Sequence, residues 1–201
     1  MWTHAAACAL SVAGLVVLVV QAARIHSPRA VVACSIFGGS LILLYLASAL
    51  YHGSRAPRAR RALRIFDHAA IYVLIAGSYT PFTLVSLGNA WGWSLFGVVW
   101  GLAAAGIVYE IFLCGRYRIV PTLVYLGMGW LSVLLIRPLL QHVPAGTIGW
   151  LAAGGVAYTA GVGFYLWKRL LHHHAIWHLF VMAGSACHFC AVLFYVLPAA
   201  A

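Results

Sequence analysis

The sequence predicts an all-α fold, a polytopic bundle of seven transmembrane helices with its N-terminus in the cytoplasm. Of the 201 residues, 65% are hydrophobic and only 7% are charged, which is more apolar surface than a soluble domain of this size can bury. Several apolar runs of about 20 residues, the length that crosses a bilayer, follow one another with short polar breaks. The runs are continuous and do not alternate with polar residues, which argues against an outer-membrane β-barrel.

Each predicted span is bounded by charged residues or a turn signal. The first apolar run lacks a basic leader, so it is predicted to stay in the membrane and not to be a removable signal peptide. The fifth span has Pro121 in its first turn, where proline is tolerated, and ends early at Arg137 and Pro138. No break is long enough for a second domain, so residues 1–201 are expected to form one bundle. The spans cover residues 5–23, 31–52, 66–87, 92–114, 119–136, 148–168 and 174–197.

Lysine and arginine residues in alternate breaks predict the orientation. With the N-terminus inside, the outer breaks hold three of them and the cytoplasmic breaks hold nine, namely Arg55, Arg58, Arg60, Arg61, Arg64, Arg116, Arg118, Lys168 and Arg169. The chain is therefore predicted to be N-in and C-out in the inner (plasma) membrane. The net charge of +10 then reflects topology and attraction to anionic phospholipid at the cytoplasmic face. The loops are too short to build a basic surface for nucleic acid.

Histidines at the cytoplasmic ends of two predicted spans indicate a metal site. His52 ends the second span, and His174 and His178 begin the seventh. The latter two are four residues apart, which places both imidazoles on one helical face. Three neutral imidazoles with an open fourth position are typical of catalytic Zn2+. Other transition-metal ions also accept imidazole, and interface anchoring of these histidines is the alternative without a metal.

Ser48 and Asp67 are the candidate catalytic residues beside that site. Ser48 lies one turn before His52 and could orient a ligand or a water molecule. Asp67 opens the third span as the only carboxylate predicted near that depth, and it could act as a general base towards water. A carboxylate at membrane depth costs about 2.5 to 3.5 kcal/mol, so it tends to be functional or paired. Pairing with one of the preceding arginines is the structural alternative: Arg58, Arg60, Arg61 or Arg64.

The remaining polar residues are assigned smaller roles. Glu110 is predicted to pair with Arg116 or Arg118, with a substrate or proton path as the alternative. His188 lies ten residues beyond His178, about 15 Å along a helix, so it cannot share that metal and is expected to line a cavity or contact a neighbouring helix. The five cysteines are predicted to be packing residues. Interface or loop positions are expected for His4, His26, His68, His142, His172 and His173.

Three motifs together carry a family resemblance. "SALYH", then "FDHAAIYVLIAGSYTPF", then "HAIWHLFVMAGSACHF" resemble the hemolysin III branch of the progestin and adipoQ receptor family. Its hallmarks are a Ser-x-x-x-His, an Asp that opens the third span and a His-x-x-x-His in the seventh. The opening "THAAA" is also similar to the family's usual Thr-His-Gly start. The resemblance implies zinc near the cytoplasmic side on His52, His174 and His178, with Ser48 and Asp67 beside it, and kinship with alkaline ceramidases.

Three function classes follow from these observations. The preferred one is a zinc-dependent hydrolase of a membrane lipid amide or ester, with Asp67 as the base and Ser48 stabilising the oxyanion; regulation of membrane lipid state is a related role. The second is a receptor or sensor with structural zinc, although the short cytoplasmic loops offer little surface to a partner. The third is a pore-forming cytolysin, as the family name suggests, although no amphipathic inserting segment is visible.

Overall fold

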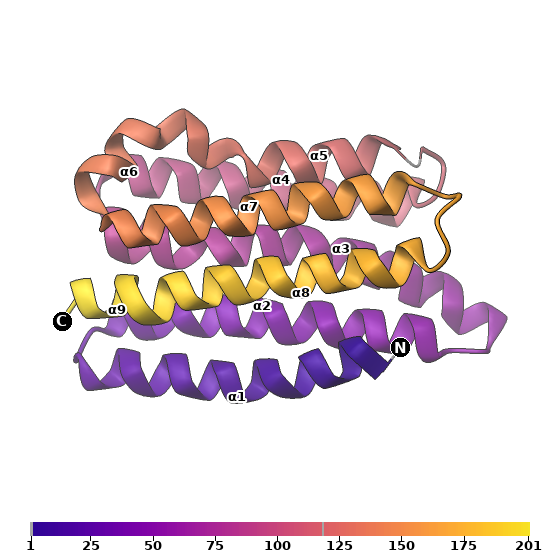
Figure 1. Cartoon of the computed structure of the whole chain (residues 1–201), viewed down its shortest axis with the longest axis horizontal. Helices are drawn as coiled ribbons and strands as arrows, with labels where there is room; N and C mark the ends of the chain where they lie inside the picture. Colours follow the sequence, from indigo (N-terminus) through magenta and orange to yellow (C-terminus); the bar gives the residue numbers. More distant parts are fainter. Residues whose placement is uncertain (1, 118) are drawn as a thin grey trace.

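The computed structural model describes residues 2–117 and 119–201, and the described residues contain helices but no strand. The long helices run roughly parallel, with the two chain termini at opposite ends of the bundle (Figure 1). The predicted all-α class is therefore confirmed.

The helices follow one another with short connections. The first half of the chain forms α1 (Trp2–Arg24), α2 (Pro28–Gly53), α3 (Pro57–Pro81), its π-helical continuation η1 (Phe82–Leu87) and α4 (Ala90–Leu113). The second half forms α5 (Ile119–Gly129), the 3-10 turn η2 (Leu131–Leu135), α6 (Ile136–His142), α7 (Ala145–Leu166), α8 (His173–Ala191), its π-helical continuation η3 (Val192–Val196) and the short α9 (Leu197–Ala199).

Local sequence signals explain where two of the helices begin. Ser27 caps α2 by accepting a hydrogen bond from the Ala30 amide at 3.3 Å, and Pro28 occupies the first turn, where no amide partner is needed. Asn89 caps α4 in the same way, accepting from the Gly92 amide at 3.1 Å. The preceding turn passes through Gly88 with a φ of 56°, a left-handed conformation that glycine adopts without steric cost.

The connection between the second and third spans is shorter than predicted. Residues 53–64 were predicted as a connection, but α3 already begins at Pro57 and carries four of the five arginines of this segment on its first two turns. Proline at the first helical position, followed by alanine, leucine and arginine, favours helix over loop. The basic segment therefore projects from the bundle as a helical extension of the third span (Figure 1).

Five helical stretches have the length and hydropathy to cross a membrane: Thr3–Arg24, Pro28–Gly53, Pro57–Leu87, Ala90–Leu113 and His173–Ala199. A sixth is present if Ile119–Leu134 and Ile136–His142, which meet at 57°, form one broken span. The predicted fifth span is thus not a straight helix. Pro138 lacks the amide that would continue the helix from the preceding turn, which accounts for a break before it. The predicted sixth span corresponds to α7, which is not among the five, so the count of seven stays a prediction.

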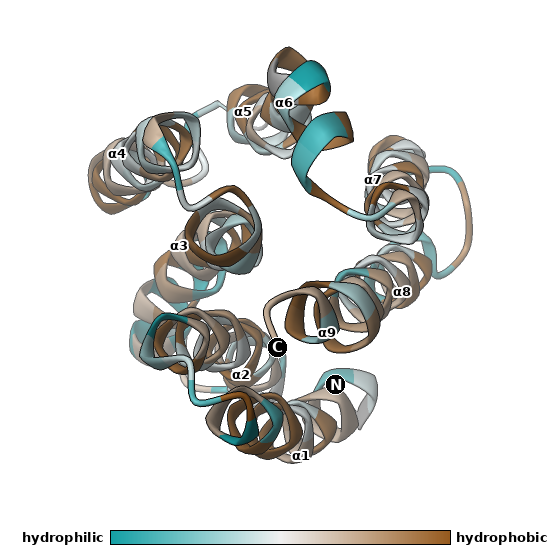
Figure 2. Cartoon of the chain, turned by 90° about the vertical axis from the view of Figure 1, so that its left-hand side faces the viewer, coloured by the Kyte–Doolittle hydropathy of each residue, from teal (hydrophilic) through white to brown (hydrophobic). Residues whose placement is uncertain are grey.

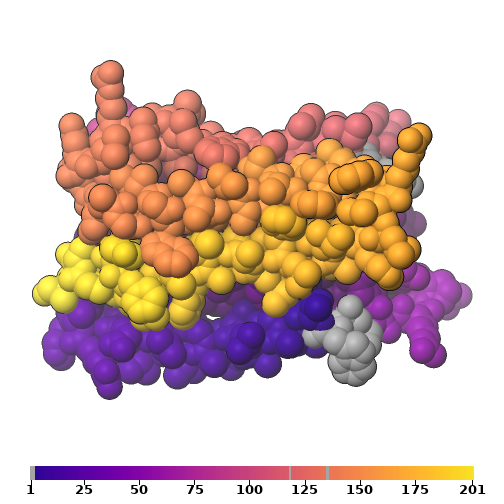
Figure 3. Space-filling view, viewed as in Figure 1, coloured from indigo at the N-terminus to yellow at the C-terminus, as the bar shows by residue number. Residues whose placement is uncertain are grey.

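The described helices form a closed ring. Each packs on the next in the order α1, α2, α3, α4, α5, α7, α8, and α8 returns to contact α1. Figure 2 shows this ring along the helix axes, and Figure 3 shows α8 lying between α7 and α1 on one face. The ring brings the first and last long helices side by side, although they lie at opposite ends of the sequence.

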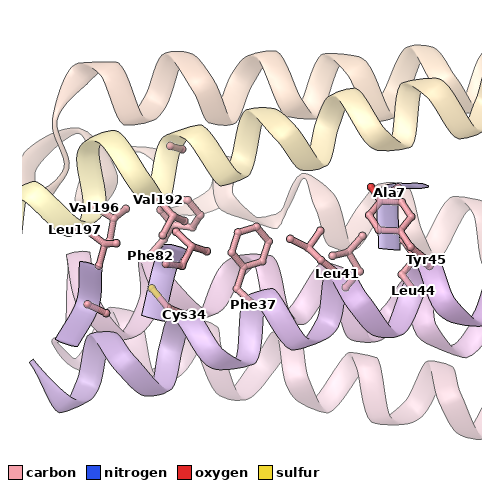
Figure 4. Packing of buried hydrophobic residues seen from close by; sticks show 14 of the residues in the cluster. Ala7, Cys34, Phe37, Leu41, Leu44, Tyr45, Phe82, Val192, Val196 and Leu197 are labelled. Atoms are coloured by element: carbon pink, nitrogen blue, oxygen red, sulfur yellow. The ribbon is translucent and has the colours of Figure 1, made fainter. Parts of the chain in front are cut away.

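The largest buried apolar cluster joins α2 to α1, to α3 and to the C-terminal helix formed by α8 and η3. Figure 4 shows Val192 and Val196 near Cys34 of α2 at one end of this cluster, with Phe37, Leu41 and Leu44 following along α2 towards Ala7 of α1. In lipid there is no hydrophobic driving force between helices, so close van der Waals packing has to stabilise such contacts. The cluster aligns α2 with the C-terminal helix along its length.

Glycine allows the closest approach between α3 and α4. A Cβ at Gly106 would lie 2.2 Å from the ring of Tyr72. Tyr72 is fully buried and its ring contacts that of Tyr125 at 4.6 Å between centroids, so the ring has little room to move. Gly106 therefore determines the spacing of these two helices.

Replacing Gly106 with alanine is expected to lower the free energy of unfolding by about 1 to 3 kcal/mol, the usual cost of overpacking. Gly101→Ala is the matched control on the same helix, because a Cβ there meets nothing within 4 Å. The two variants are compared by thermal unfolding in detergent. Equal midpoints for both variants would contradict the proposed contact.

Candidate functional site

Three histidines predicted as metal ligands converge at one end of the bundle. His52 lies in the last turn of α2, and His174 and His178 lie in the first two turns of α8. The Nε2 atoms of His52 and His174 are 3.1 Å apart. The ring centroid of His178 lies 4.4 Å from that of His174 and 5.2 Å from that of His52. One ring nitrogen from each lies within 4.8 Å of the others, so a single metal ion could contact all three.

The donor set fits zinc. His178 is buried, and its Nδ1 has no hydrogen-bond partner among the described residues. His52 and His174 are half-buried, which leaves the site open on one side. Leaving a buried polar nitrogen unpaired costs about 1 to 3 kcal/mol, which a metal ligand bond would offset. Three imidazoles with room for a fourth ligand match the geometry that zinc adopts in catalytic sites.

A fourth histidine, His4, lies against this group, and sequence reasoning missed it. It was predicted at the interface or in a loop, but it is on α1 and only 3% exposed. Its ring centroid is 3.8 Å from that of His178 and 5.1 Å from that of Tyr45. The predicted topology already placed the start of the first span at the same membrane face as His52 and His174. That depth was the signal that could have identified His4.

A hydrogen-bond network holds α2, α7 and α8 together below the histidines. The Tyr45 hydroxyl donates to Ser185 Oγ at 2.8 Å, and the Tyr158 hydroxyl lies 2.9 Å from the same oxygen. Ser185 is two turns beyond His178 on α8, and Tyr45 is two turns before His52 on α2. The network therefore fixes the register of the two helices that carry the three histidines.

The two predicted catalytic residues lie beside the histidines. Ser48 is one turn deeper than His52 and only 1% exposed. Asp67 is half-buried on α3 and lies next to Ser48. In the described part of the chain, its carboxylate forms no ion pair with any of the arginines that were its predicted structural partners: Arg58, Arg60, Arg61 and Arg64.

The histidines, Ser48 and Asp67 all line one internal cavity of about 570 Å³. Below this polar mouth its wall is largely apolar and includes Leu74, Phe82, Leu151 and Val181. The volume lies within the range of about 300 to 1,000 Å³ that is usual for small-molecule sites. His188 lines the cavity and is absent from the three-histidine cluster, as predicted.

Glu110 does not pair with Arg116, one of its two predicted partners. It is fully buried; its Oε2 lies 3.3 Å from Nδ1 of His68, and Tyr125 donates to its Oε1 at 3.3 Å. Arg116 follows the end of α4 and lies over the Tyr117 ring instead, and Arg118 is outside the described residues. His68, predicted at the interface or in a loop, is helical and half-buried. Asp67 is therefore not the only carboxylate at this end of the bundle.

The sequence is similar to known proteins over nearly its whole length. The family model described as "Haemolysin-III related" matches residues 1–189. Hemolysin-3 of Bacillus cereus is 44% identical over 198 residues, which cover 98% of this chain and 90% of that protein. The hemolysin-3 homolog of Bacillus subtilis (strain 168) is 45% identical over 193 residues, covering 96% and 91%.

The similarity extends to a human protein. The human monocyte to macrophage differentiation factor is 30% identical over 176 residues, which cover 80% of this chain and 69% of that protein. These matches confirm the resemblance found in the three sequence motifs. Together with the apolar helices, they identify the chain as a multi-pass membrane protein of the Haemolysin-III related family.

Proposed function

We propose that this protein is a zinc-dependent hydrolase that cleaves an amide or ester bond of a membrane lipid. The observation that carries the proposal is the convergence of His52, His174 and His178 at the polar mouth of a largely apolar cavity. Zinc on these imidazoles would supply Lewis acidity to a substrate carbonyl and would make a water molecule more acidic.

Asp67 and Ser48 supply the acid–base and electrostatic functions in this proposal. The Asp67 carboxylate, which is not neutralised by the preceding arginines in the described chain, accepts the proton of the attacking water as a general base. Ser48 has a buried hydroxyl beside Asp67, and in this proposal it donates a hydrogen bond to the oxygen that becomes negative in the transition state. The proton on Asp67 then passes to the leaving amine or alkoxide.

The cavity accounts for the choice of a lipid substrate. Its deeper wall consists mainly of apolar side chains, which suit an acyl chain, and they also exclude bulk water from the reacting bond. A site within a membrane bundle can receive a lipid laterally, whereas a polar soluble substrate would first have to leave water.

We further propose that the protein crosses the inner (plasma) membrane seven times, with the broken α5–α6 segment as the fifth span and α7 as the sixth. In this topology the site faces the cytoplasm. The N-terminus, the α2–α3 connection and the start of α8 lie at one end of the bundle, and the C-terminus lies at the other (Figure 1). The arginines at the start of α3 lie at the same end as the site, so the positive-inside rule favours a cytoplasmic site in contact with anionic phospholipid.

Reporter fusions test this orientation. In a bacterial host, alkaline phosphatase at the C-terminus is expected to be active, because an odd number of spans carries it to the periplasm. Green fluorescent protein at the N-terminus is expected to fluoresce, because it folds in the cytoplasm. A fluorescent N-terminal fusion together with an inactive C-terminal phosphatase, or a dark N-terminal fusion together with an active phosphatase, would place both termini on one side of the membrane. Either outcome would require an even number of spans and would contradict the proposed topology.

Metal analysis tests the ligand set. Each protein is purified in detergent without chelators. The double variant His174→Ala/His178→Ala and the single variant His52→Ala are each expected to contain one zinc ion per chain less than the wild type, because each lacks imidazole ligands. His142→Ala is the matched control, since this exposed histidine lies at the end of α6, outside the cluster. An unchanged zinc content in both ligand variants would refute the site.

Hydrolysis assays test the role of Asp67. Asp67→Asn is expected to keep its zinc but to release fatty acid from ceramide in phospholipid liposomes at least about 100-fold more slowly, the usual contribution of a general base. Ser48→Ala is expected to slow release less, because it removes one oxyanion donor. Turnover unchanged in the zinc-loaded Asp67→Asn variant would remove this role.

The same liposomes distinguish the alternatives. Dye release that does not depend on zinc would support a pore-forming cytolysin, and zinc binding without hydrolysis or dye release would support a receptor or sensor with structural zinc.

A further inference from the structure

We propose a second metal site, formed by His68, Glu110 and Cys114, that binds a divalent transition-metal ion such as zinc. It is separate from the three-histidine site and does not depend on the proposed hydrolase activity. Nδ1 or Nε2 of His68, a carboxylate oxygen of Glu110 and Sγ of Cys114 all lie within 4.8 Å of one another.

The two helices present these ligands in a fixed arrangement. Glu110 lies in the last turn of α4 and Cys114 is the residue that ends it, so the two are four residues apart on one helical face. His68 comes from α3, which packs against α4. Arg64, one turn before His68, donates to the Cys114 carbonyl at 3.2 Å and holds the end of α4 against α3.

Glu110 is the group that points to a ligand. It is completely buried, and its Oε2 lies 3.3 Å from His68 Nδ1 in a contact that does not have the geometry of a hydrogen bond. Its other oxygen, Oε1, is held by the Tyr125 hydroxyl. A carboxylate buried in this way is expensive unless a cation compensates it. The carboxylate is thus directed towards His68 and Cys114, the other two donors, and away from solvent.

The donor chemistry selects the class of ion. Imidazole, carboxylate and thiolate together are a ligand set typical of zinc, and they disfavour magnesium and calcium, which prefer oxygen donors. Glutamate and thiolate would contribute two negative charges and so neutralise a divalent ion. The C-terminal end of α4 adds the partial negative charge of the helix dipole.

An ion can reach this second site from the cavity. His68, Arg64 and Gly115 line the cavity wall, and the His68 side chain is 30% exposed. Glu110 and Cys114 lie behind these residues, between α3 and the end of α4. The second site thus adjoins the cavity wall at His68.

Cobalt binding tests the proposal, because a thiolate bound to Co2+ gives a charge-transfer absorption that the cysteine-free three-histidine site cannot produce. Full-length protein in detergent is stripped of metal and titrated with Co2+. The wild type is expected to bind two ions per chain and to show the band. Cys114→Ser is expected to lose the band and one ion, whereas Cys187→Ser, the matched control on α8, keeps both.

Two further variants separate this site from the hydrolase site. His174→Ala/His178→Ala is expected to keep the thiolate band, so failure of the three-histidine site leaves this result intact. Glu110→Gln is expected to weaken the cobalt binding that produces the band at least tenfold. The absence of the band in wild type, or its persistence in Cys114→Ser, would overturn the proposal and leave Glu110 and His68 as a structural ion pair.

Discussion

The cost of leaving a polar group unpaired in hydrocarbon is the constraint on which the rest of this structure depends. Several buried polar side chains on the long helices face polar side chains on a different helix. Tyr45 and Tyr158 share Ser185, and Glu110 faces His68 and Tyr125. The Tyr45–Ser185 contact joins α2 to α8, 140 positions later in the sequence, whereas the other contacts join successive helices. The polar groups therefore help to specify both which helices become neighbours and how successive helices pack.

Small residues then allow those neighbours to approach. Gly154 of α7 leaves room for the His188 ring, since a Cβ there would lie 2.5 Å from it, and Gly184 of α8 does the same for Tyr158. Large polar rings on one helix thus lie over glycines on the other, which gives the α7–α8 pair both dense packing and hydrogen bonds. The cavity lies on the inner side of this pair, where α5, η2 and α6 also contribute to its wall.

Sequence alone predicted much of this arrangement because the relevant signals are local. Apolar length predicts helices, and the four-residue spacing of His174 and His178 places them on one face. Membrane depth then predicts that His52 lies at the same level. The contact between His68 and Glu110 could not be predicted in the same way. The face of a helix that contacts a given neighbour depends on the rotation of the helix about its own axis. Hydropathy does not contain that information.

The bend between α5 and α6 has a different origin. Proline at position 138 was visible in the sequence, but a proline near a predicted helix end is compatible with either a terminus or a kink. The packing of α6 against η1 and α7 decides between a terminus and a kink. The contact between α6 and η1 joins residues about 50 positions apart in the sequence. Local signals therefore predicted the elements, and long-range contacts determined their shapes.

The closed ring, in which α8 contacts α1, has a consequence for biosynthesis. His52 and His174 are separated by 122 residues, and a chain emerging from the ribosome inserts its N-terminal helices first. The imidazoles of α1 and α2 therefore enter the bilayer well before the helix that completes their site has been translated. During that interval they depend on lipid headgroups or on the insertion machinery for hydration. Arrival of the last long helix is consequently the step that both closes the bundle and shields its most polar end.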